Sequence, residues 1–380
     1  MDYRDNADEA QFRAELRSWL AEHAPADPPP RDADERMEYN HQWHLALAQG
    51  GWLGLSFPVE YGGQGRSLIY DAILNDELGV AGLPSVPAIN HITNAIRLFG
   101  TEEQKRAHLP GLLSCTVLWC QGFSEPNAGS DLSSLRTRGV RVAEAGSPDV
   151  YRVDGQKIWT SEAVWAQWCL LLLRTEFDVP AHRGLSMLMV PMDTPGIECR
   201  PIVTSYGSSE FAEVFFTDAA VPAANMLGQP GQGWAIAMQL LGFERGPADM
   251  GWTARLERTL TMLETRVRSG ELAVSPSQRE ALAGAWVELQ TLKLHVQRST
   301  GARLDGHAPG PEGSIDKLLM TNADQLLGHV VLDVLGAEAV LDDVAAFPGY
   351  VWSRAQSIFG GTQQIQRNIV AQRVLGLPRP

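Results

Sequence analysis

The chain has 380 residues, of which 44% are hydrophobic and 20% charged, so it is long enough for two or three globular domains with sizeable cores. The formal net charge is −14 and no basic stripe is visible, which excludes nucleic acid as an expected partner. The acidic N-terminus lacks the basic and apolar regions of a signal peptide. The longest apolar run, "CLLLL" at 169–173, is too short to cross a bilayer. We therefore expect a cytoplasmic protein with no membrane span.

Residues 1–115 are predicted to be mostly helical. The stretches "DEAQFRAELRSWLAEH" and "NHQWHLALAQGGWLGL" carry apolar residues at spacings of three and four, which is typical of helices with one buried face. "HITNAIRLFG" is followed by "TEEQKRAHLPGLL", in which Thr101 is the expected N-cap in front of two acidic residues. We interpret this segment as an N-terminal helical domain.

The pattern changes near residue 116. Short apolar runs such as "WCLLLLRT", "GLSMLMVPM" and "FAEVFFTDAAVP" are separated by turns rich in proline and glycine. This favours a central antiparallel β-domain over residues 116–222. Within it, Asp154-Gly155 stands between two extended runs of "YRVDGQKIWTS" and predicts a hairpin turn.

Long helices return in residues 223–380. "GWAIAMQLLGFERG", "ARLERTLTMLETRVRSG", "SQREALAGAWVELQTLKLHVQRSTGARL" and "SIDKLLMTNADQLLGHVVLDVLG" all show helical apolar spacing. Four or more such helices in series predict a bundle. Pro247 is expected to end or kink the first of them. The fold class predicted for the whole chain is α+β.

Common signatures of nucleotide, metal and nucleophile sites do not occur in the sequence. No G-x-G-x-x-G follows a strand, and there is no P-loop, H-E-x-x-H or G-x-S-x-G. His41 and His44 have no third partner in the sequence pattern, so no metal site is expected. The four cysteines show no C-x-x-C spacing and are expected to be free thiols.

The stretch "GFSEPNAGSDLSSLRTR" at 122–138 is rich in small and polar residues. Gly129 and Ser130 would let backbone N–H groups approach an oxygen-rich ligand. Taken alone, the stretch is explained equally well as a turn between strands.

Two further motifs change this interpretation: "GQKIWTS" at 155–161 and "FGGTQQIQRNIVAQRVLG" near the C-terminus. Together with the first, they closely resemble the acyl-CoA dehydrogenase family. The resemblance runs the length of the chain, because it includes, in order, "FGTEEQKRAHLP", "RGLSMLMVPMDTPGI", "EVFFTDAAVP" and "GQGWAIAMQLLGFERG". It implies an N-terminal helical domain, a central β-domain and a C-terminal four-helix bundle, with FAD between the last two.

The resemblance also assigns FAD contacts residue by residue. Phe123 and Ser124 would touch the isoalloxazine edge largely through backbone, Trp159 would pack on the flavin, and Ser161 would hydrogen-bond near N5. Ser130 would approach both the FAD phosphate and the substrate. The full set of implied cofactor contacts is Gln121, Phe123, Ser124, Gly129, Ser130, Trp159, Ser161, Thr362 and Gln364.

Thr362 and Gln364 match the family's residues that hold the adenosine half of FAD, which is bound partly by a neighbouring subunit. The resemblance therefore implies a homodimer or homotetramer, with a heteromer as the alternative. The sequence departs from the family at the cross-subunit elements. No Arg-x-x-Phe-Gly is found, and Arg279 is only a vague candidate for it. The Gln-x-x-Gly-Gly motif appears as "DVLGAEA", with Asp333 and Ala337 at the changed positions.

Most of the family places its catalytic Glu immediately before the Gly-Thr pair, where this sequence has Gly360. Its backbone N–H is still expected to meet the thioester carbonyl. In the isovaleryl-CoA and long-chain branches the base comes from an acidic-Arg pair at the start of the bundle, and Glu244-Arg245 matches that pair. Without the match, Glu244 would be interpreted as a solvated helix-end residue. Phe243 and Arg245 are expected, with Ser130, to bind the substrate.

These features predict FAD-dependent α,β-dehydrogenation of an acyl-CoA, or of another acyl thioester, to the trans-2-enoyl thioester. Glu244 would be the general base, flavin N5 would accept the hydride, and an electron-transfer flavoprotein would accept the electrons. The small residue at 360 favours branched or bulky acyl groups. Two alternatives remain: a flavin-dependent oxidase or monooxygenase, and a partner subunit of a heteromeric dehydrogenase.

Overall fold

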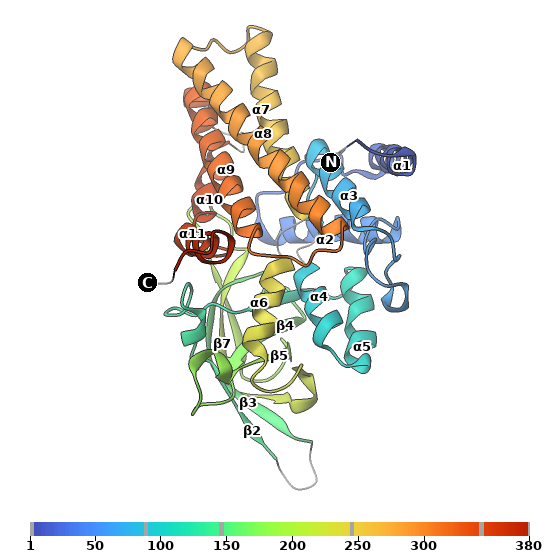
Figure 1. The fold of residues 1–380 in the computed structure, drawn as a ribbon, viewed down its shortest axis with the longest axis vertical. Coiled ribbons are helices and arrows are strands. Elements are labelled where there is room, and N and C mark those ends of the chain that lie inside the picture. Colours follow the sequence, from blue (N-terminus) through green and yellow to red (C-terminus); the bar gives the residue numbers. More distant parts are fainter. Residues whose placement is uncertain (1–3, 87–89, 144–147, 244–246, 342–345, 379–380) are drawn as a thin grey trace. The chain divides into compact units, whose positions relative to one another are not determined.

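The computed structural model describes residues 4–86, 90–143, 148–243, 247–341 and 346–378 (Figure 1). The chain folds as two compact units: Met1–Ala26, Arg66–Val86 and Arg245–Pro380 form one, and Asp27–Gly65 and Pro87–Glu244 form the other. The helices near the N-terminus are thus divided between the two units. The fold is α+β, as predicted, with helices before and after a central sheet. In the described part of the chain, no helix is long and apolar enough to cross a membrane.

The second unit is built around an eight-stranded sheet with the order β6-β7-β3-β2-β4-β5-β8, and β1 pairs with β4. Its pairing is antiparallel, as predicted, except that β1 and β2 each pair with β4 in parallel. The strands are β1 (Trp119–Gly122), β2 (Arg138–Val142), β3 (Val150–Ser161), β4 (Trp168–Arg174), β5 (Leu185–Pro191), β6 (Ile197–Ile202), β7 (Phe211–Pro222) and β8 (Met226–Leu227).

Strand β4 is apolar along its length because both of its faces are covered. Leu170 and Leu172 belong to one hydrophobic core, and Leu171 and Leu173 belong to another. The first core also receives apolar side chains from the helices of this unit, including Ile236. A strand buried on both sides has no solvent face to mark with polar residues. The run "CLLLL" therefore reflects a central strand.

The predicted hairpin at Asp154-Gly155 is wrong. Strand β3 passes through these residues and pairs with β2 and with β7. The register with β7 shifts between Val153 and Gly155, which marks a bulge. A Cβ at Gly155 would lie 2.4 Å from Thr137 Oγ1, so the glycine permits a close backbone approach. Pairing on both sides of the strand outweighs the local turn preference of Asp-Gly.

The helices of this unit are α2 (Ala33–Gln49), α4 (Asn90–Phe99), α5 (Glu102–Leu113) and α6 (Gly233–Phe243). The predicted cap of α5 is confirmed: Thr101 Oγ1 accepts the N–H of Gln104 at 3.2 Å, and Gln104 Oε1 accepts the N–H of Thr101 at 3.0 Å. The amide of Gln104 also donates to the carbonyls of Ala224 and Met226 at 2.9 and 3.0 Å. One side chain thus caps α5 and ties it to the segment that leads into α6.

The first unit is helical. In it α7, α8 and α9 pack side by side around one core (Figure 1). Helix α3 approaches α7 closely, since a Cβ at Gly79 would lie 2.4 Å from the carbonyl oxygen of Gly251. The break predicted at Pro247 falls on residues 244–246, between the last residue given for α6 and the first given for α7, and so lies outside the described residues. The helices are α1 (Ala7–His23), α3 (Leu68–Ala81), α7 (Pro247–Arg268), α8 (Pro276–Leu304), α9 (Gly313–Leu335), α10 (Ala346–Ala355) and α11 (Gln363–Ile369).

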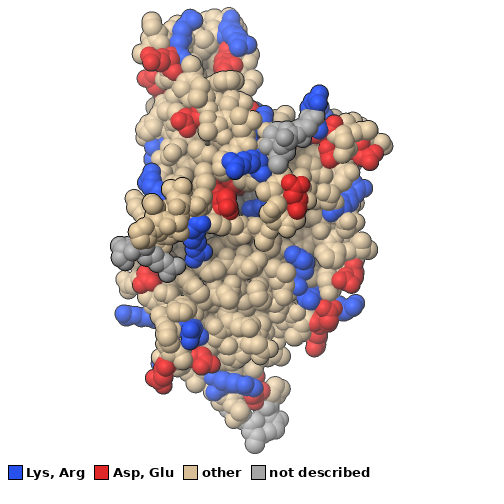
Figure 2. All heavy atoms as spheres, viewed as in Figure 1, with Lys and Arg blue, Asp and Glu red and all other residues tan. Residues whose placement is uncertain are grey.

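Charged side chains of both signs are interspersed on the surface. On the face that Figure 2 draws, Lys and Arg lie among Asp and Glu in several places. One surface ion pair joins Arg200 Nε to Glu198 Oε1 at 2.7 Å, with side chains 57% and 60% exposed. A pair so exposed contributes little to stability, because water screens both charges.

Helix α9 carries a polar stripe inside this helical unit. Lys317, Thr321 and Asp324 recur at intervals of four and three residues, so they share one helix face, and all three are buried or half-buried. The Asp324 carboxylate accepts a hydrogen bond from Gln356 Nε2. Burial raises the pKa of Asp324 to about 6, although the charges of Arg354 and Lys317 act in the opposite direction.

The substitution Asp324→Asn is expected to stabilise the protein at pH 7.5 and to have little effect at pH 4. The carboxyl binds its proton more tightly when folded than when unfolded, so its contribution to stability falls as the pH rises from about 4 to about 6. Asn keeps an acceptor for Gln356 without a charge. The expected gain above pH 7 is about 1–3 kcal/mol, measured by urea unfolding. Asp333→Asn, at an exposed position of α9, is the control. An equal gain at both pH values would contradict the assignment.

Candidate active site

The predicted site residues fall into two sets, one in each compact unit. Phe243 is the last residue of α6, whereas Glu244 and Arg245 lie outside the described residues. In the helical unit, the turn into α11 carries Gly360, Thr362 and Gln364. In the sheet unit, β1, the loop after it and β3 carry Gln121, Phe123, Ser124, Gly129, Ser130, Trp159 and Ser161.

A buried ion pair fastens the loop after β1 to β3. Lys157 Nζ lies 2.9 Å from Glu125 Oε1 and also donates to the carbonyl of Phe123 at 3.0 Å. The Lys157 and Glu125 side chains are only 0% and 8% exposed. Glu125 accepts two further hydrogen bonds, from the N–H groups of Arg136 and Thr137 at 2.7 and 2.8 Å. One carboxylate thus joins both ends of the loop and binds them to the strand.

Burial lowers the pKa of Lys157 to about 8, although the charge of Glu125 opposes the shift. Burial alone would raise the pKa of Glu125, but Lys157 and the donors at residues 136 and 137 hold it below its ordinary value. Both groups are therefore charged at neutral pH. The sequence motifs contain both residues, but no role was predicted for either from the sequence. The pattern that could have indicated one is that Lys157 falls on the buried face of an alternating strand.

The tip of this loop is open to a ligand. Gly129 and Ser130 are exposed, and a Cβ at Gly129 would meet no heavy atom within 4 Å. The chain itself therefore gives no steric reason for a glycine here, whereas a ligand approaching the backbone would. Nearer β1 the loop is held, because the Ser124 carbonyl accepts the N–H of Ile158 at 2.9 Å. The open tip on a fastened base fits the phosphate-binding role predicted for it.

Trp159 is 56% exposed, which is unusual for so large an aromatic side chain. Its φ of 60° lies in the left-handed region, and the β3–β7 register shifts between Lys157 and Thr160. The bulge thus interrupts the alternation of the strand at Trp159. The ring stands edge-on to Phe211, with centroids 6.1 Å apart, and Ser161 is also exposed. An exposed indole at a strained backbone position fits a flat aromatic ligand such as the isoalloxazine ring of FAD.

The turn before α11 has a defined backbone conformation. Gly360 and Gly361 have φ angles of 61° and 89°, which favour glycine. Thr362 Oγ1 accepts the N–H three residues on at 3.3 Å and caps α11. Gln366 Nε2 donates to the carbonyl of Gly360 at 2.7 Å, a contact that sequence reasoning missed. Gln364 is exposed and therefore open to a ligand.

The altered adenosine motif lies at one end of the helical unit. Asp333 is in the last turn of α9, and Ala337 is in the short 3-10 turn Gly336–Ala339 that follows. Gln278 Nε2 donates to the carbonyl of Asp333 at 2.8 Å. Arg279, the next residue on α8, is exposed at the same end. The candidate arginine and the altered motif are thus neighbours in this unit.

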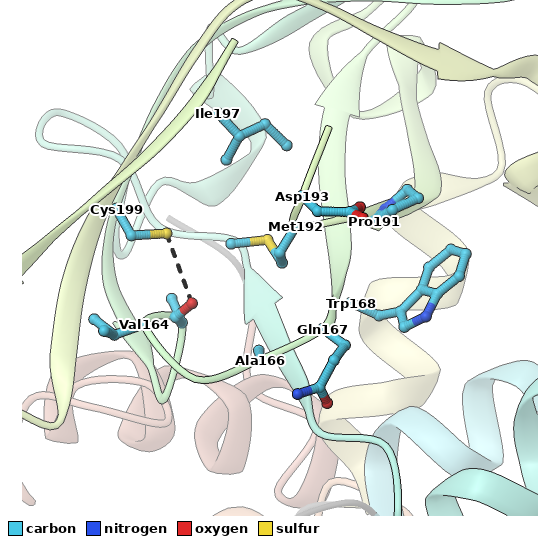
Figure 3. A pocket seen from close by; sticks show the side chains of 10 residues that line it. Val164, Ala166, Gln167, Trp168, Pro191, Met192, Asp193, Ile197 and Cys199 are labelled. Carbon is cyan, nitrogen blue, oxygen red and sulfur yellow. Dashed lines mark hydrogen bonds between the residues drawn. The ribbon is translucent and has the colours of Figure 1, made fainter. Parts of the chain in front are cut away.

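The sheet unit also has an open groove of about 620 Å³ (Figure 3). Trp168, Met192 and Cys199 are among the residues that line it. Cys199 Sγ donates to the carbonyl of Ala163 at 3.6 Å, and burial raises the pKa of its thiol to about 11. The thiol is therefore protonated at neutral pH and is a poor nucleophile. None of the predicted site residues that the structure describes lines this groove.

Three family profiles match the chain: the acyl-CoA dehydrogenase N-terminal domain over residues 6–116, the middle domain over 120–219 and the C-terminal domain over 231–375. The acyl-CoA dehydrogenase IpdE1 of Mycolicibacterium smegmatis is 39% identical over 97% of this chain and 98% of its own length. The solved structure named Tcur3481-Tcur3483 steroid ACAD is 30% identical to this chain. The match covers 100% of this chain and 100% of that chain, with a TM-score of 0.88. A chain of the ChsE4-ChsE5 complex from Mycobacterium tuberculosis is 29% identical over 100% of both chains, with a TM-score of 0.84.

The substitution Glu125→Gln is expected to destabilise the protein by about 3–5 kcal/mol, because it leaves the buried ammonium of Lys157 facing a neutral amide. The matched control is Glu198→Gln, which removes the same charge from the exposed pair with Arg200 and should leave the free energy of unfolding unchanged. Urea unfolding followed by tryptophan fluorescence measures both. Equal effects of the two substitutions would show that the buried pair does not hold the loop.

Proposed function

The chain belongs to the acyl-CoA dehydrogenase family, whose members are FAD-dependent oxidoreductases, and we propose that it converts an acyl-CoA thioester to the trans-2-enoyl thioester. The observation that carries this proposal is the exposed, strained Trp159 beside the fastened loop of residues 123–137, an arrangement suited to a flat cofactor. When bound, FAD would supply the hydride acceptor at N5 for the hydride of the substrate's β-carbon, and an electron-transfer flavoprotein would take up the electrons.

Glu244 is the proposed general base. It follows Phe243, the last residue of α6, whose apolar face packs into the core through Ile236, Ala237 and Leu240. The carboxylate takes the α-proton, and the electrons of that C–H bond form the new double bond as the β-hydride leaves. Gly360, which occupies the usual place of the base, has no proton-accepting side chain.

Backbone and side-chain donors complete the proposed substrate site. The N–H of Gly360 hydrogen-bonds to the thioester carbonyl and stabilises the charge that develops there when the α-proton leaves. The left-handed φ of Gly360 and the bond from Gln366 to its carbonyl support this, because they restrict how the turn can move. Ser130, Phe243 and Arg245 bind the CoA thioester in this proposal.

The proposed acyl group is bulky and polycyclic. The absence of a side chain at Gly360 leaves room beside the reacting carbons, and a similar solved protein is named a steroid ACAD. The same protein and the ChsE4-ChsE5 complex are each named as a pair of chains. Together with the altered residues Asp333 and Ala337, this favours a heteromer over the homodimer or homotetramer, with a partner chain that helps to hold the adenosine half of FAD.

The substitution Glu244→Gln tests the base. It should keep the flavin and most of the affinity for substrate, and it should slow reduction of the flavin roughly 10²–10⁴-fold, the usual contribution of a positioned base. The loss should appear in kcat as well as in kcat/KM, because it falls on the chemical step. Stopped-flow absorbance of the FAD-loaded protein under anaerobic conditions measures the rate.

Glu162→Gln is the matched control. Glu162 is the residue directly after Ser161, the last residue of β3, and the substitution removes the same carboxylate. It should reduce its flavin within about threefold of the parent rate, because Glu162 takes no part in the chemical step of this proposal. If Glu162→Gln is slow and Glu244→Gln is fast, the assignment of the base is wrong and Glu162 replaces it.

A further inference from the structure

Lys317 is a buried lysine on α9 whose ammonium group meets the end of α10. Its side chain is 2% exposed, and Nζ donates to the carbonyl of Gln356 at 2.5 Å. Thr321, one turn further along α9, donates its hydroxyl to the carbonyl of Lys317 at 2.8 Å, and its Oγ1 lies 3.4 Å from the carbonyl of Gln356. Gln356 immediately follows Ala355, the last residue of α10. Lys317 therefore contacts the chain at the point where α10 stops.

A helix C-terminus leaves carbonyl groups without intrahelical donors and carries a partial negative charge. A cation there satisfies both the hydrogen bond and the electrostatics. Transfer of an ammonium group from water to a buried site is itself costly, and an apolar residue in its place often gives equal or greater stability. The position of Lys317 is thus better explained by where it holds α10 than by the stability that it contributes.

The segment after α10 is held by the same lysine. The Phe359 ring lies 4.6 Å from Lys317 Nζ, a cation–π contact. The ring also packs against Trp352, with centroids 5.4 Å apart, and Trp352 packs against Trp252 of α7 at 5.1 Å. Phe359 is therefore fixed between α9 and α10, although it is 41% exposed.

Phe359 is directly followed by the Gly360-Gly361-Thr362 turn. Beyond the turn, Gln366 holds the carbonyl of Gly360, and Thr362 caps α11. The turn thus lies between two fixed ends. Lys317 of α9 holds the end before it, and α11 after it contacts α9 through Gln363 Nε2, which donates to Asn322 Oδ1 at 3.4 Å. Any shift of Gln356 and Phe359 would be passed to the peptide that joins Phe359 to Gly360, which contains the Gly360 N–H.

We propose that Lys317 is a positioning residue: by capping α10 at Gln356 and packing on Phe359, it sets the location of the Gly360-Gly361-Thr362 turn. The proposal rests on the proposed function, in which this turn meets the thioester and the adenosine half of FAD. Lys317 touches neither ligand and acts through the backbone of the turn.

The test is Lys317→Met in the FAD-loaded protein, because methionine keeps an unbranched apolar stem and removes the ammonium group. Hydrogen exchange should be at least about tenfold faster at amides 357–362 than in the parent, as local opening of the freed segment becomes easier. The affinity for FAD should fall, and kcat/KM should fall about 10²-fold, the effect expected of a misplacement of about 1 Å. Lys317→Arg, which keeps a cation, should restore part of both.

The matched control is Gln325→Met. Gln325 also links α9 to α10, through Nε2 and the carbonyl of Ser353 at 3.0 Å, and this hydrogen bond reaches α10 itself and not the segment after it. It should lower the melting temperature without changing exchange at 357–362. Phe359→Leu, a milder change at a partly exposed residue, should speed the same exchange less than Lys317→Met, and it serves if Lys317→Met does not fold.

Unchanged exchange at 357–362 in both Lys317→Met and Phe359→Leu would overturn the proposal. Hydrogen exchange at amides 357–362 that is accelerated as much in Gln325→Met as in Lys317→Met would also overturn the proposal. The effect would then be a general weakening of the contact between α9 and α10. If exchange speeds only in the Lys317 and Phe359 variants while FAD affinity and kcat/KM stay at the parent values, the capping is correct. In that case the role given to the turn in the proposed function is wrong.

Discussion

The ion pair between Lys157 and Glu125 is the interaction on which the candidate site residues of the sheet unit depend. Both charges are out of water, a costly arrangement unless every partner is in place. Glu125 accepts hydrogen bonds from the ammonium of Lys157 and from two backbone N–H groups. If the loop of residues 123–137 left the strand, the buried ammonium of Lys157 would lose this partner. Trp159 lies two residues beyond Lys157 on the same strand. One buried pair therefore fixes the loop and the strand that carry the candidate site residues of this unit.

The helical unit uses a related arrangement. Lys157 donates to the carbonyl of Phe123, and Lys317 donates to the carbonyl of Gln356. In each case a buried ammonium group holds one carbonyl, and a few residues further along the chain lies an exposed glycine, Gly129 after Phe123 and Gly360 after Gln356. Such segments gain little stability from their own contacts and would otherwise sample many conformations. Fixing the residue before each segment, and leaving its tip open, combines a defined site with access for ligands.

Local patterns predicted the elements whose causes are local. The cap at Thr101 depends on residues within one helical turn, and its prediction is confirmed. Asp154-Gly155 failed because the pairing of β3 with two distant strands outweighs a turn signal. The pairing of Lys157 with a residue 32 positions away could not be read from spacing. The family was predicted from separated motifs in the right order, whereas the role of Glu244 stays a prediction.

The most direct measurement is the absorbance of the bound flavin when acyl-CoA thioesters are added without oxygen or any other electron acceptor. The series should run from short straight chains to polycyclic acyl groups, on the chain alone and in any complex that it forms. The proposed function predicts that at least one bulky acyl-CoA bleaches the flavin stoichiometrically and yields a product lighter by two hydrogens. A flavin that stays oxidised with every thioester, in every assembly that binds FAD, would contradict it.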